Sequence, residues 1–230
     1  MGNIDLDALM FRWKEAHRDK GWQNFIYDGA VNTAMYESST PKICFFLKEA
    51  YSKGDDTSWS LTDWLNDGAM TRMWGSVAEW SYGIMHTTKT FIPPKPVLST
   101  SEKTMQLRSS AIVNVKKSNG QVQSDYDDLL RYVIEDKELL KEELEILNPD
   151  VIVCGNNSSL LRVLFGARIN SKHKVDSDGQ INYEFMRKNG FAFVGTRVII
   201  DYYHPANQYP SIMNYYTVCS LYQQALRARG

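Results

Sequence analysis

The chain has 230 residues, of which 43% are hydrophobic, and this is enough to bury the core of one substantial domain. Its 26 lysine and arginine residues nearly balance its 27 aspartate and glutamate residues, which excludes a protein that binds polyanions through its overall charge. Any contact with nucleic acid must then rest on a local basic patch.

The N-terminus and the cysteines exclude further classes. Residues 1–6 contain no apolar signal core, and no apolar run approaches the roughly 18 residues of a membrane span, so we expect a soluble, cytoplasmic protein with no membrane partner. Cys44, Cys154 and Cys219 are far apart in apolar or helical runs, which indicates buried thiols and neither a disulfide framework nor a four-cysteine iron–sulfur site. No histidine has metal-ligand spacing, so we expect no metal and no cofactor.

Hydrophobic periodicity predicts helices at both ends of the chain and between the strands. The first two, at 5–20 and 22–36, form an N-terminal helical extension over about 1–38. Later helices are expected at 59–65, 70–85, 125–147, 160–165 and 209–228. The cluster Gly155-Asn156-Asn157-Ser158 is expected to cap the helix at 160–165. Residues 86–104, rich in Thr, Ser, Pro and Lys, predict an exposed loop.

Short apolar runs with polar or proline boundaries predict the strands. They lie at 42–47, 110–115, 150–154 and 197–203, with a further strand at 191–195 that pairs with the last one. Strands that alternate with helices are typical of a mostly parallel sheet covered on both faces. We therefore predict one α/β domain over 1–230, a three-layer α/β/α arrangement with a central sheet of about four strands.

Polar side chains stand where three of the predicted strands end. Glu49 follows the first, Asn114 lies near the end of the second, and His204 follows the last, in the stretch Asp201-Tyr202-Tyr203-His204-Pro205. The carboxyl ends of parallel strands are where α/β proteins place ligands. These three residues are therefore candidates for one site if their strands are parallel neighbours. Taken singly, each has an ordinary structural interpretation: a loop histidine, a turn or capping asparagine and a solvated charge.

The strand ends together resemble the motifs of the uracil-DNA glycosylase superfamily, above all its thermostable bacterial branch. Phe46-Leu47-Lys48-Glu49-Ala50-Tyr51-Ser52 is similar to that branch's Phe-Leu-Gly-Glu-Ala-Pro-Gly, and Asn114-Val115-Lys116 to its Asn-Val-Lys. Pro149-Asp150-Val151-Ile152-Val153 resembles its Pro-x-Val-Ile-Val strand, and Tyr203-His204-Pro205-Ala206 its late Tyr-His-Pro signature. The likeness covers about 42–52, 110–117, 144–165 and 197–210. It implies a four-stranded parallel sheet between helices and excision of a flipped base. No lysine is placed convincingly as a Schiff-base nucleophile, so we expect a monofunctional enzyme, and we expect it to act as a monomer on single- or double-stranded DNA.

The resemblance implies a role for each strand-end residue. Asn114 would read the base, because an amide offers one donor and one acceptor to a pyrimidine edge. His204 would donate a hydrogen bond to the base oxygen as negative charge develops on the leaving base. Glu49 would stabilise the sugar cation or orient the attacking water. In a second register Glu49 aligns with the Asp of the Gly-Gln-Asp-Pro-Tyr branch, and in both it is the acid nearest the strand end.

Other residues have secondary roles in this interpretation. Trp59 is the candidate to stack on the base, with core packing as its alternative. The candidate contacts to the DNA backbone are Lys48, Lys116, Lys117 and Tyr209. Lys48 or Leu47 stands where the family has glycine, so a side chain there would reshape the pocket and change the accepted base. The iron–sulfur cysteines of the thermostable branch are absent.

Two other functions are consistent with the sequence. The near-neutral charge and the altered Glu49 loop suit a catalytically inactive member that binds a nucleotide, a nucleic acid or a protein. The third alternative is an unrelated Rossmann-like enzyme that acts on a small molecule.

Overall fold

The computed structural model describes residues 2–22, 24–51, 57–121 and 123–229. Its strands are β1 (Ile26–Tyr27), β2 (Gly29–Ala30), β3 (Ile43–Glu49), β4 (Trp59–Ser60), β5 (Ser110–Lys116), β6 (Val151–Gly155), β7 (Phe191–Val194) and β8 (Arg197–Tyr202). Its helices are α1 (Gly2–Asp19), α2 (Thr33–Ser38), α3 (Leu61–Asn66), α4 (Arg72–His86), α5 (Thr100–Arg108), α6 (Tyr126–Glu135), α7 (Lys137–Leu147), α8 (Ser158–Leu164), α9 (Tyr183–Asn189) and α10 (Ser211–Ala228).

The predicted apolar strands form the centre of a six-stranded sheet with the order β2-β5-β3-β6-β8-β7. The four inner strands are mutually parallel, and β2 and β7 add antiparallel edges. The mixed α/β class and the mostly parallel sheet are confirmed, as is the pairing of β7 with β8. The count of about four strands is wrong, because both outer strands extend the parallel core. A separate pair, β1 and β4, lies beside the sheet.

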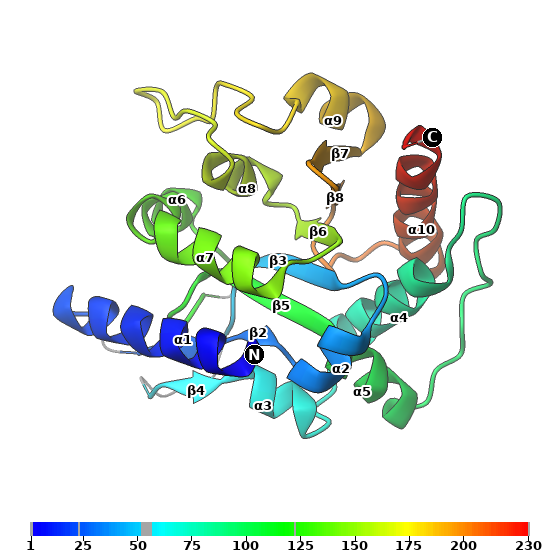
Figure 1. Ribbon diagram of the computed structural model, residues 1–230, viewed down its shortest axis with the longest axis horizontal. Coiled ribbons are helices and arrows are strands. Elements are labelled where there is room, and N and C mark those ends of the chain that lie inside the picture. The colour runs from blue at the N-terminus through cyan, green and yellow to red at the C-terminus, as the bar shows by residue number, and fades with distance from the viewer. Residues whose placement is uncertain (1, 23, 52–56, 122, 230) are drawn as a thin grey trace.

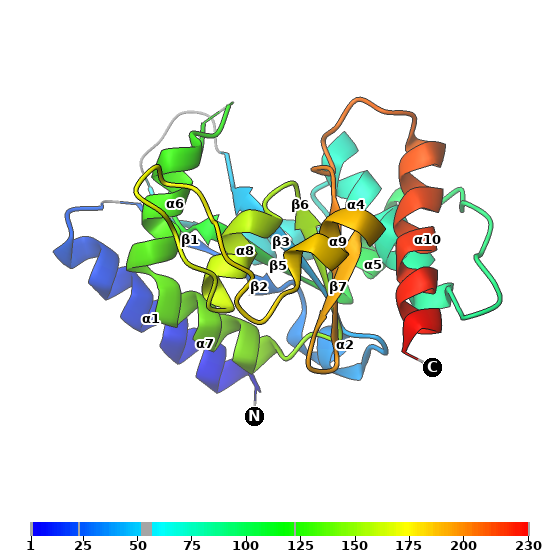
Figure 2. The ribbon, with the colours of Figure 1, turned by 90° about the horizontal axis from the view of Figure 1, so that it is seen from above.

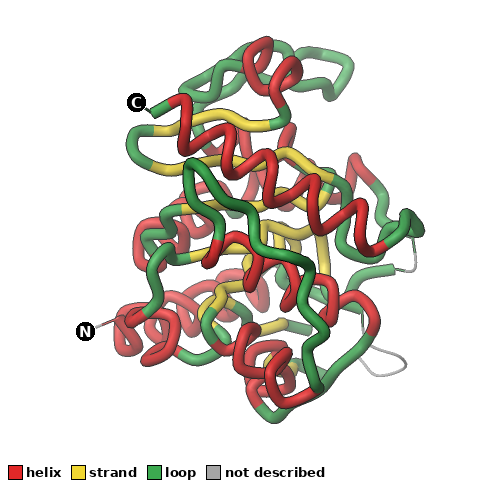
Figure 3. Tube along the Cα trace, turned by 90° about the vertical axis from the view of Figure 1, so that its right-hand side faces the viewer, coloured by secondary structure: helices red, strands yellow, loops and turns green. Residues whose placement is uncertain are grey.

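Helices pack on both faces of the sheet, and the side chains of each inner strand alternate between two cores. In β3, Cys44 and Phe46 belong to the core under α1, α6, α7 and α8, while Phe45 and Leu47 belong to the core under α3, α4 and α10. This alternation follows from the two-residue period of a strand, and it explains why the central residues of these strands are apolar on both faces. Figures 1 and 2 show the two helical groups on opposite sides, and in Figure 3 α10 runs across its face in front of the strands.

Two helix predictions are wrong. The segment 22–36 contains β1, β2 and only the start of α2. Gly29 has φ +117°, and a Cβ there would lie 2.8 Å from Cδ2 of Leu6, so the chain turns tightly against α1. The helix predicted over 125–147 is two helices that meet at Asp136. The Asp136 carboxylate lies 2.6 Å from Nε2 of His17 in the buried interior, and this contact ties the break to α1.

The segment predicted as a loop over 86–104 is irregular only between α4 and α5. Residues 87–99 form no helix or strand, and α5 then begins with a capping box between Ser99 and Glu102. The hydroxyl of Tyr215 on α10 donates to the carbonyls of Pro93 and Pro94, at 3.2 and 3.3 Å. These bonds attach the loop to α10. Within the described ranges, no helix is both long and apolar enough to cross a membrane.

Candidate functional site

The strand ends that carry the predicted site residues lie at one edge of the sheet. Leu47 pairs with Asn114, and Gly155 with Tyr202, in the parallel register. Glu49 and Asn114 come from adjacent strands, whereas β6 separates β8 from β3. Between Asn114 and Gly155 there are two strand spacings, about 10 Å between Cα atoms. No hydrogen bond joins the described side chains of Glu49, Asn114 and His204.

The chain changes direction across the sheet between β3 and β6. It passes from β3 to β5 on one side and from β6 to β8 on the other, so the connections diverge at this point. In open α/β sheets, ligands bind in the crevice outside the carboxyl ends of the strands at such a switch point. The switch point therefore identifies the β3–β6 crevice, lined by Lys48 and Asn157, as the place to look for a ligand.

His204 leans over the end of β6. A Cβ on Gly155 would lie 3.1 Å from Cδ2 of His204 and 2.8 Å from Cδ2 of Leu47, so only glycine leaves room for the ring. Nδ1 of His204 accepts a hydrogen bond of 3.2 Å from the backbone N–H of Ala206. In a neutral imidazole the proton then sits on Nε2, which is the donor.

The loop that carries His204 is held by amide hydrogen bonds. The side chain of Asn207 donates to the carbonyl of His204 at 2.8 Å and accepts from Asn214 on α10 at 2.9 Å. Asn214 also donates to the carbonyl of Tyr209 at 3.3 Å. The loop is thus attached to α10 at several points. These hydrogen bonds hold the backbone of His204 in place and do not involve its ring.

Burial, and secondly the positive charge of Lys48, lower the pKa of His204 from 6.5 to about 4. We expect the ring to titrate in an NMR experiment with a midpoint near pH 4, and Lys48→Met to raise the pKa only partway toward 6.5. Because the pKa of His204 is lower in the folded protein than in the unfolded chain, protonation of this residue favours the unfolded chain. Its contribution to the free energy of unfolding is therefore complete above pH 6.5 and is lost as the pH falls toward 4. A midpoint near 6.5 in the parent protein would contradict this assignment.

Asn114 is buried and held by Asp28. One carboxylate oxygen of Asp28 accepts from the backbone N–H of Asn114 at 2.7 Å and from its side-chain amide at 3.0 Å. The other oxygen is bound by the ammonium of Lys117, which also contacts Glu143 at 2.7 Å. The side chains of Lys117, Asp28 and Glu143 are fully buried. Asp28 therefore fixes the orientation of Asn114 and engages one of the two N–H donors of its amide.

Glu49 is engaged by the loop that follows β5. Its side chain is 5% exposed, with one oxygen 3.5 Å from the ammonium of Lys116 and the other accepting from the backbone N–H of Gln121 at 3.3 Å. Its Cγ is so close to Gly120 that a Cβ there would lie 2.4 Å away. The carboxylate thus lies against this loop. Residues 52–56, which include Ser52 of the first motif, fall outside the described ranges.

The other predicted residues are more widely spread. The indole N–H of Trp59 lies 3.5 Å from the side-chain oxygen of Asn119, and its ring packs edge-on against Trp64. Tyr209 is 49% exposed and contacts Tyr203. Lys116 forms ion pairs with Glu49 and Asp128, and the ammonium of Lys117 is fully buried, so it presents no donor to a phosphate.

The local sequence pattern reveals neither the role of Asp28 nor the surroundings of the Asn157 side chain. Asp28 lies in a predicted helix, and nothing in the local pattern indicates its contact with a residue 86 positions later. The sequence predicts that the Asn/Ser cluster at 155–158 caps the next helix. Asn157 is the N-cap residue of α8, but its side chain makes no capping hydrogen bond. It is 3% exposed, and both its side-chain nitrogen and oxygen lack a partner among the described residues.

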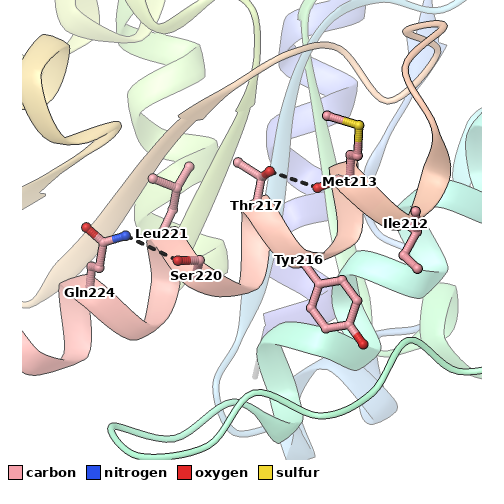
Figure 4. A pocket seen from close by; sticks show the side chains of 7 residues that line it. All are labelled: Ile212, Met213, Tyr216, Thr217, Ser220, Leu221 and Gln224. Atoms are coloured by element: carbon pink, nitrogen blue, oxygen red, sulfur yellow. Dashed lines mark hydrogen bonds between the residues drawn. The ribbon is translucent and has the colours of Figure 1, made fainter.

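Two surface hollows differ in chemistry. A groove of about 470 Å³ lies along α10, where Figure 4 shows its largely apolar lining of Ile212, Met213, Tyr216, Thr217, Ser220, Leu221 and Gln224. It has no charged side chain to activate a substrate. A smaller cavity of about 160 Å³ lies in the crevice between β3 and β6 and is lined by Lys48, Ser124, Tyr126, Leu129, Asn156, Asn157 and Leu160. The smaller cavity is the one with polar and charged groups beside the sheet edge.

In the described part of the chain, no three His, Cys, Asp or Glu side chains are grouped so that they could hold a metal ion. In comparisons with protein-family models, curated proteins and solved structures, the chain matched none of them.

Proposed function

We propose that this protein is a cofactor-free DNA glycosylase with a three-layer α/β/α domain, acting as a monomer on uracil or another damaged or modified base. The observation that carries the proposal is the neutral His204, held over Gly155 beside the switch-point crevice with its donor on Nε2. A neutral imidazole that carries its proton on Nε2 can donate a hydrogen bond to an oxygen on the leaving base.

The proposed reaction is hydrolysis of the N-glycosidic bond of a nucleotide flipped out of the stack. The bond between the base nitrogen and C1′ breaks, and its electron pair leaves with the base. A water oxygen bonds to C1′, and the water proton passes to solvent or to the departing base. His204 stabilises the negative base, and Glu49 stabilises the cationic sugar or orients the water.

Asn114 is the proposed base reader, and Trp59 the proposed stacking partner. The Cα atoms of Asn114 and Gly155 are about 10 Å apart, so the Asn114 amide and the His204 ring over Gly155 stand two strand spacings from each other at the same end of the sheet. The contact with Asp28 gives the Asn114 amide a single orientation, which a reader of donor and acceptor patterns requires. A base with the wrong pattern would leave buried polar groups unpaired, at about 1–3 kcal/mol each.

The test is a panel of oligonucleotides that carry uracil, hypoxanthine, xanthine or a hypermodified base in single- and double-stranded DNA. We expect release of at least one free base and an abasic site that breaks only on alkali treatment, because a monofunctional enzyme leaves the strand intact. Free base is measured by chromatography, and strand breaks by denaturing gels. Absence of free base from every substrate would contradict the proposal.

A second candidate function is a binding module without catalysis. The observation that favours it is the engagement of Glu49 by Lys116 and by the backbone of Gln121, which occupies the carboxylate proposed to serve the sugar or the water. In the same panel, this function predicts binding of nucleotide or DNA with no abasic product.

A further inference from the structure

The cavity at the switch point has an excess of positive charge. Lys48 lies at its rim, and none of the residues that line it is acidic. Among the described residues, no carboxylate lies within the 4.0 Å of an ion pair with Lys48, whereas Lys116 and Lys117 each bind two acids. Lys48 is thus the candidate backbone-contacting lysine that has no ion-pair partner within the described ranges, and its positive charge lowers the pKa of His204.

A second feature of the cavity wall is the amide of Asn157. This residue is 3% exposed, and its nitrogen and oxygen both lack partners among the described residues. Leaving such a buried polar group unpaired costs about 1–3 kcal/mol, which a ligand can recover by hydrogen bonding. The hydroxyl groups of Ser124 and Tyr126 lie in the same lining. The cavity therefore combines one cation with several neutral donors.

The size of the cavity limits what enters it. Its volume of about 160 Å³ corresponds to roughly five water molecules at ~30 Å³ each. This is enough for a tetrahedral oxyanion with part of its hydration shell, but not for a whole nucleotide. The rest of a nucleotide would have to lie outside the cavity, along the sheet edge where His204 stands.

We propose that this cavity binds the phosphate group of a nucleotide, with Lys48 as its counter-ion and the Asn157 amide as an N–H donor. Lysine serves phosphates as a point charge, and neutral N–H and O–H donors complete the coordination of the oxygens. The inference rests on the proposed function, because the phosphate group that we expect in the cavity belongs to a phosphodiester of DNA beside the flipped nucleotide. A free nucleoside monophosphate presents the same chemistry from a second source.

Two substitutions test the cavity. Lys48→Met removes the charge and keeps the chain length, and Asn157→Asp replaces the N–H donors with a repelling carboxylate. The matched control is Lys188→Met, because Lys188 is an exposed lysine on α9 that likewise forms no ion pair among the described residues.

The probes are a short single strand with one uracil, the same strand with a neutral methylphosphonate on the 5′ side of the uracil, dUMP and deoxyuridine. Affinity is measured by calorimetry, and folding of each variant by circular dichroism.

We expect Lys48→Met and Asn157→Asp each to weaken binding of the normal strand about 10-fold or more, as for loss of a charge-assisted hydrogen bond. Binding of the methylphosphonate strand and of deoxyuridine should not change, and Lys188→Met should resemble the parent throughout. If the effect occurs with dUMP and not with DNA, the phosphate site stands with a free nucleotide as its ligand.

Equal affinity of the parent and Lys48→Met for the normal strand and for dUMP would overturn the phosphate site. Base release by the parent protein in that case would leave the proposed glycosylase function intact. The reverse result, Lys48-dependent phosphate binding with no base release from any substrate, would support the site and reject the glycosylase.

Discussion

Replacement of His204 by alanine should lower the rate of base release by about 100- to 1000-fold, the cost of removing one donor that stabilises developing negative charge. The ring is a neutral donor, because its Nδ1 is occupied by the N–H of Ala206 and burial and Lys48 depress its pKa. The loss should therefore appear in kcat and persist across neutral pH. The measurement is single-turnover release of free base from the best substrate of the panel.

The matched control is His86→Ala, because His86 is an exposed histidine at the end of α4. It should retain the parent rate. A second variant, Gly155→Ala, removes no functional group but places a methyl carbon 3.1 Å from Cδ2 of His204, so it should displace the ring and lower the rate. A His204→Ala protein that folds and releases base within threefold of the parent would refute the catalytic role.

Lys117→Met should lower the free energy of unfolding by about 3–5 kcal/mol, the usual cost of removing one partner from a buried charge pair. Burial alone would lower the pKa of Lys117, but Asp28 and Glu143 outweigh burial and raise it. Burial raises the pKa of Glu143 well above its usual range despite Lys117. The ammonium of Lys117 and the carboxylate of Asp28 then neutralise each other. Lys117→Met leaves Asp28 without its counter-ion. Urea unfolding measures the change.

Lys141→Met is the control, because Lys141 forms an exposed ion pair of 3.0 Å with Glu138 on α7. Its loss should cost no more than about 1 kcal/mol. Adding Asp28→Asn and Glu143→Gln to Lys117→Met should recover part of the stability, since no buried charge remains. A loss below about 1 kcal/mol for Lys117→Met alone would show that the cluster is not a buried charge pair. The same variant should loosen Asn114, which Asp28 holds.

The pattern of apolar and polar residues along the chain is sufficient to predict the four inner strands and the β7–β8 hairpin. Each of these strands is a short run of buried residues with a polar or glycine boundary, so its signal lies in adjacent residues. The two-residue strands β1 and β2 carry no such signal, because they depend on partners far along the chain. The break at Asp136 was also missed, since its partner His17 is 119 residues away.

Part of the candidate site could likewise be predicted from the sequence, and part could not. That Glu49, Asn114 and His204 lie at one sheet edge could be predicted, because parallel strands end together. Which of the lysines has an unneutralised charge could not be predicted. Lys116 and Lys117 follow Asn114 by two and three residues, yet each forms an ion pair with an acid from another part of the chain, while Lys48 lines the cavity.

By itself, the sequence determined the class of the fold and the residues that stand at the carboxyl ends of its strands, because hydrophobic periodicity and polar boundaries are properties of neighbouring residues. Only the tertiary structure decided the strand order, the crevice between β3 and β6, and the partners of each charge. Those depend on contacts between residues that are far apart in the sequence, such as Asp28 with Asn114 and His17 with Asp136. The free energy of a buried polar group is set by the groups that surround it, so the lowered pKa of His204, and the lack of a partner for the Asn157 amide among the described residues, arise only in the folded chain.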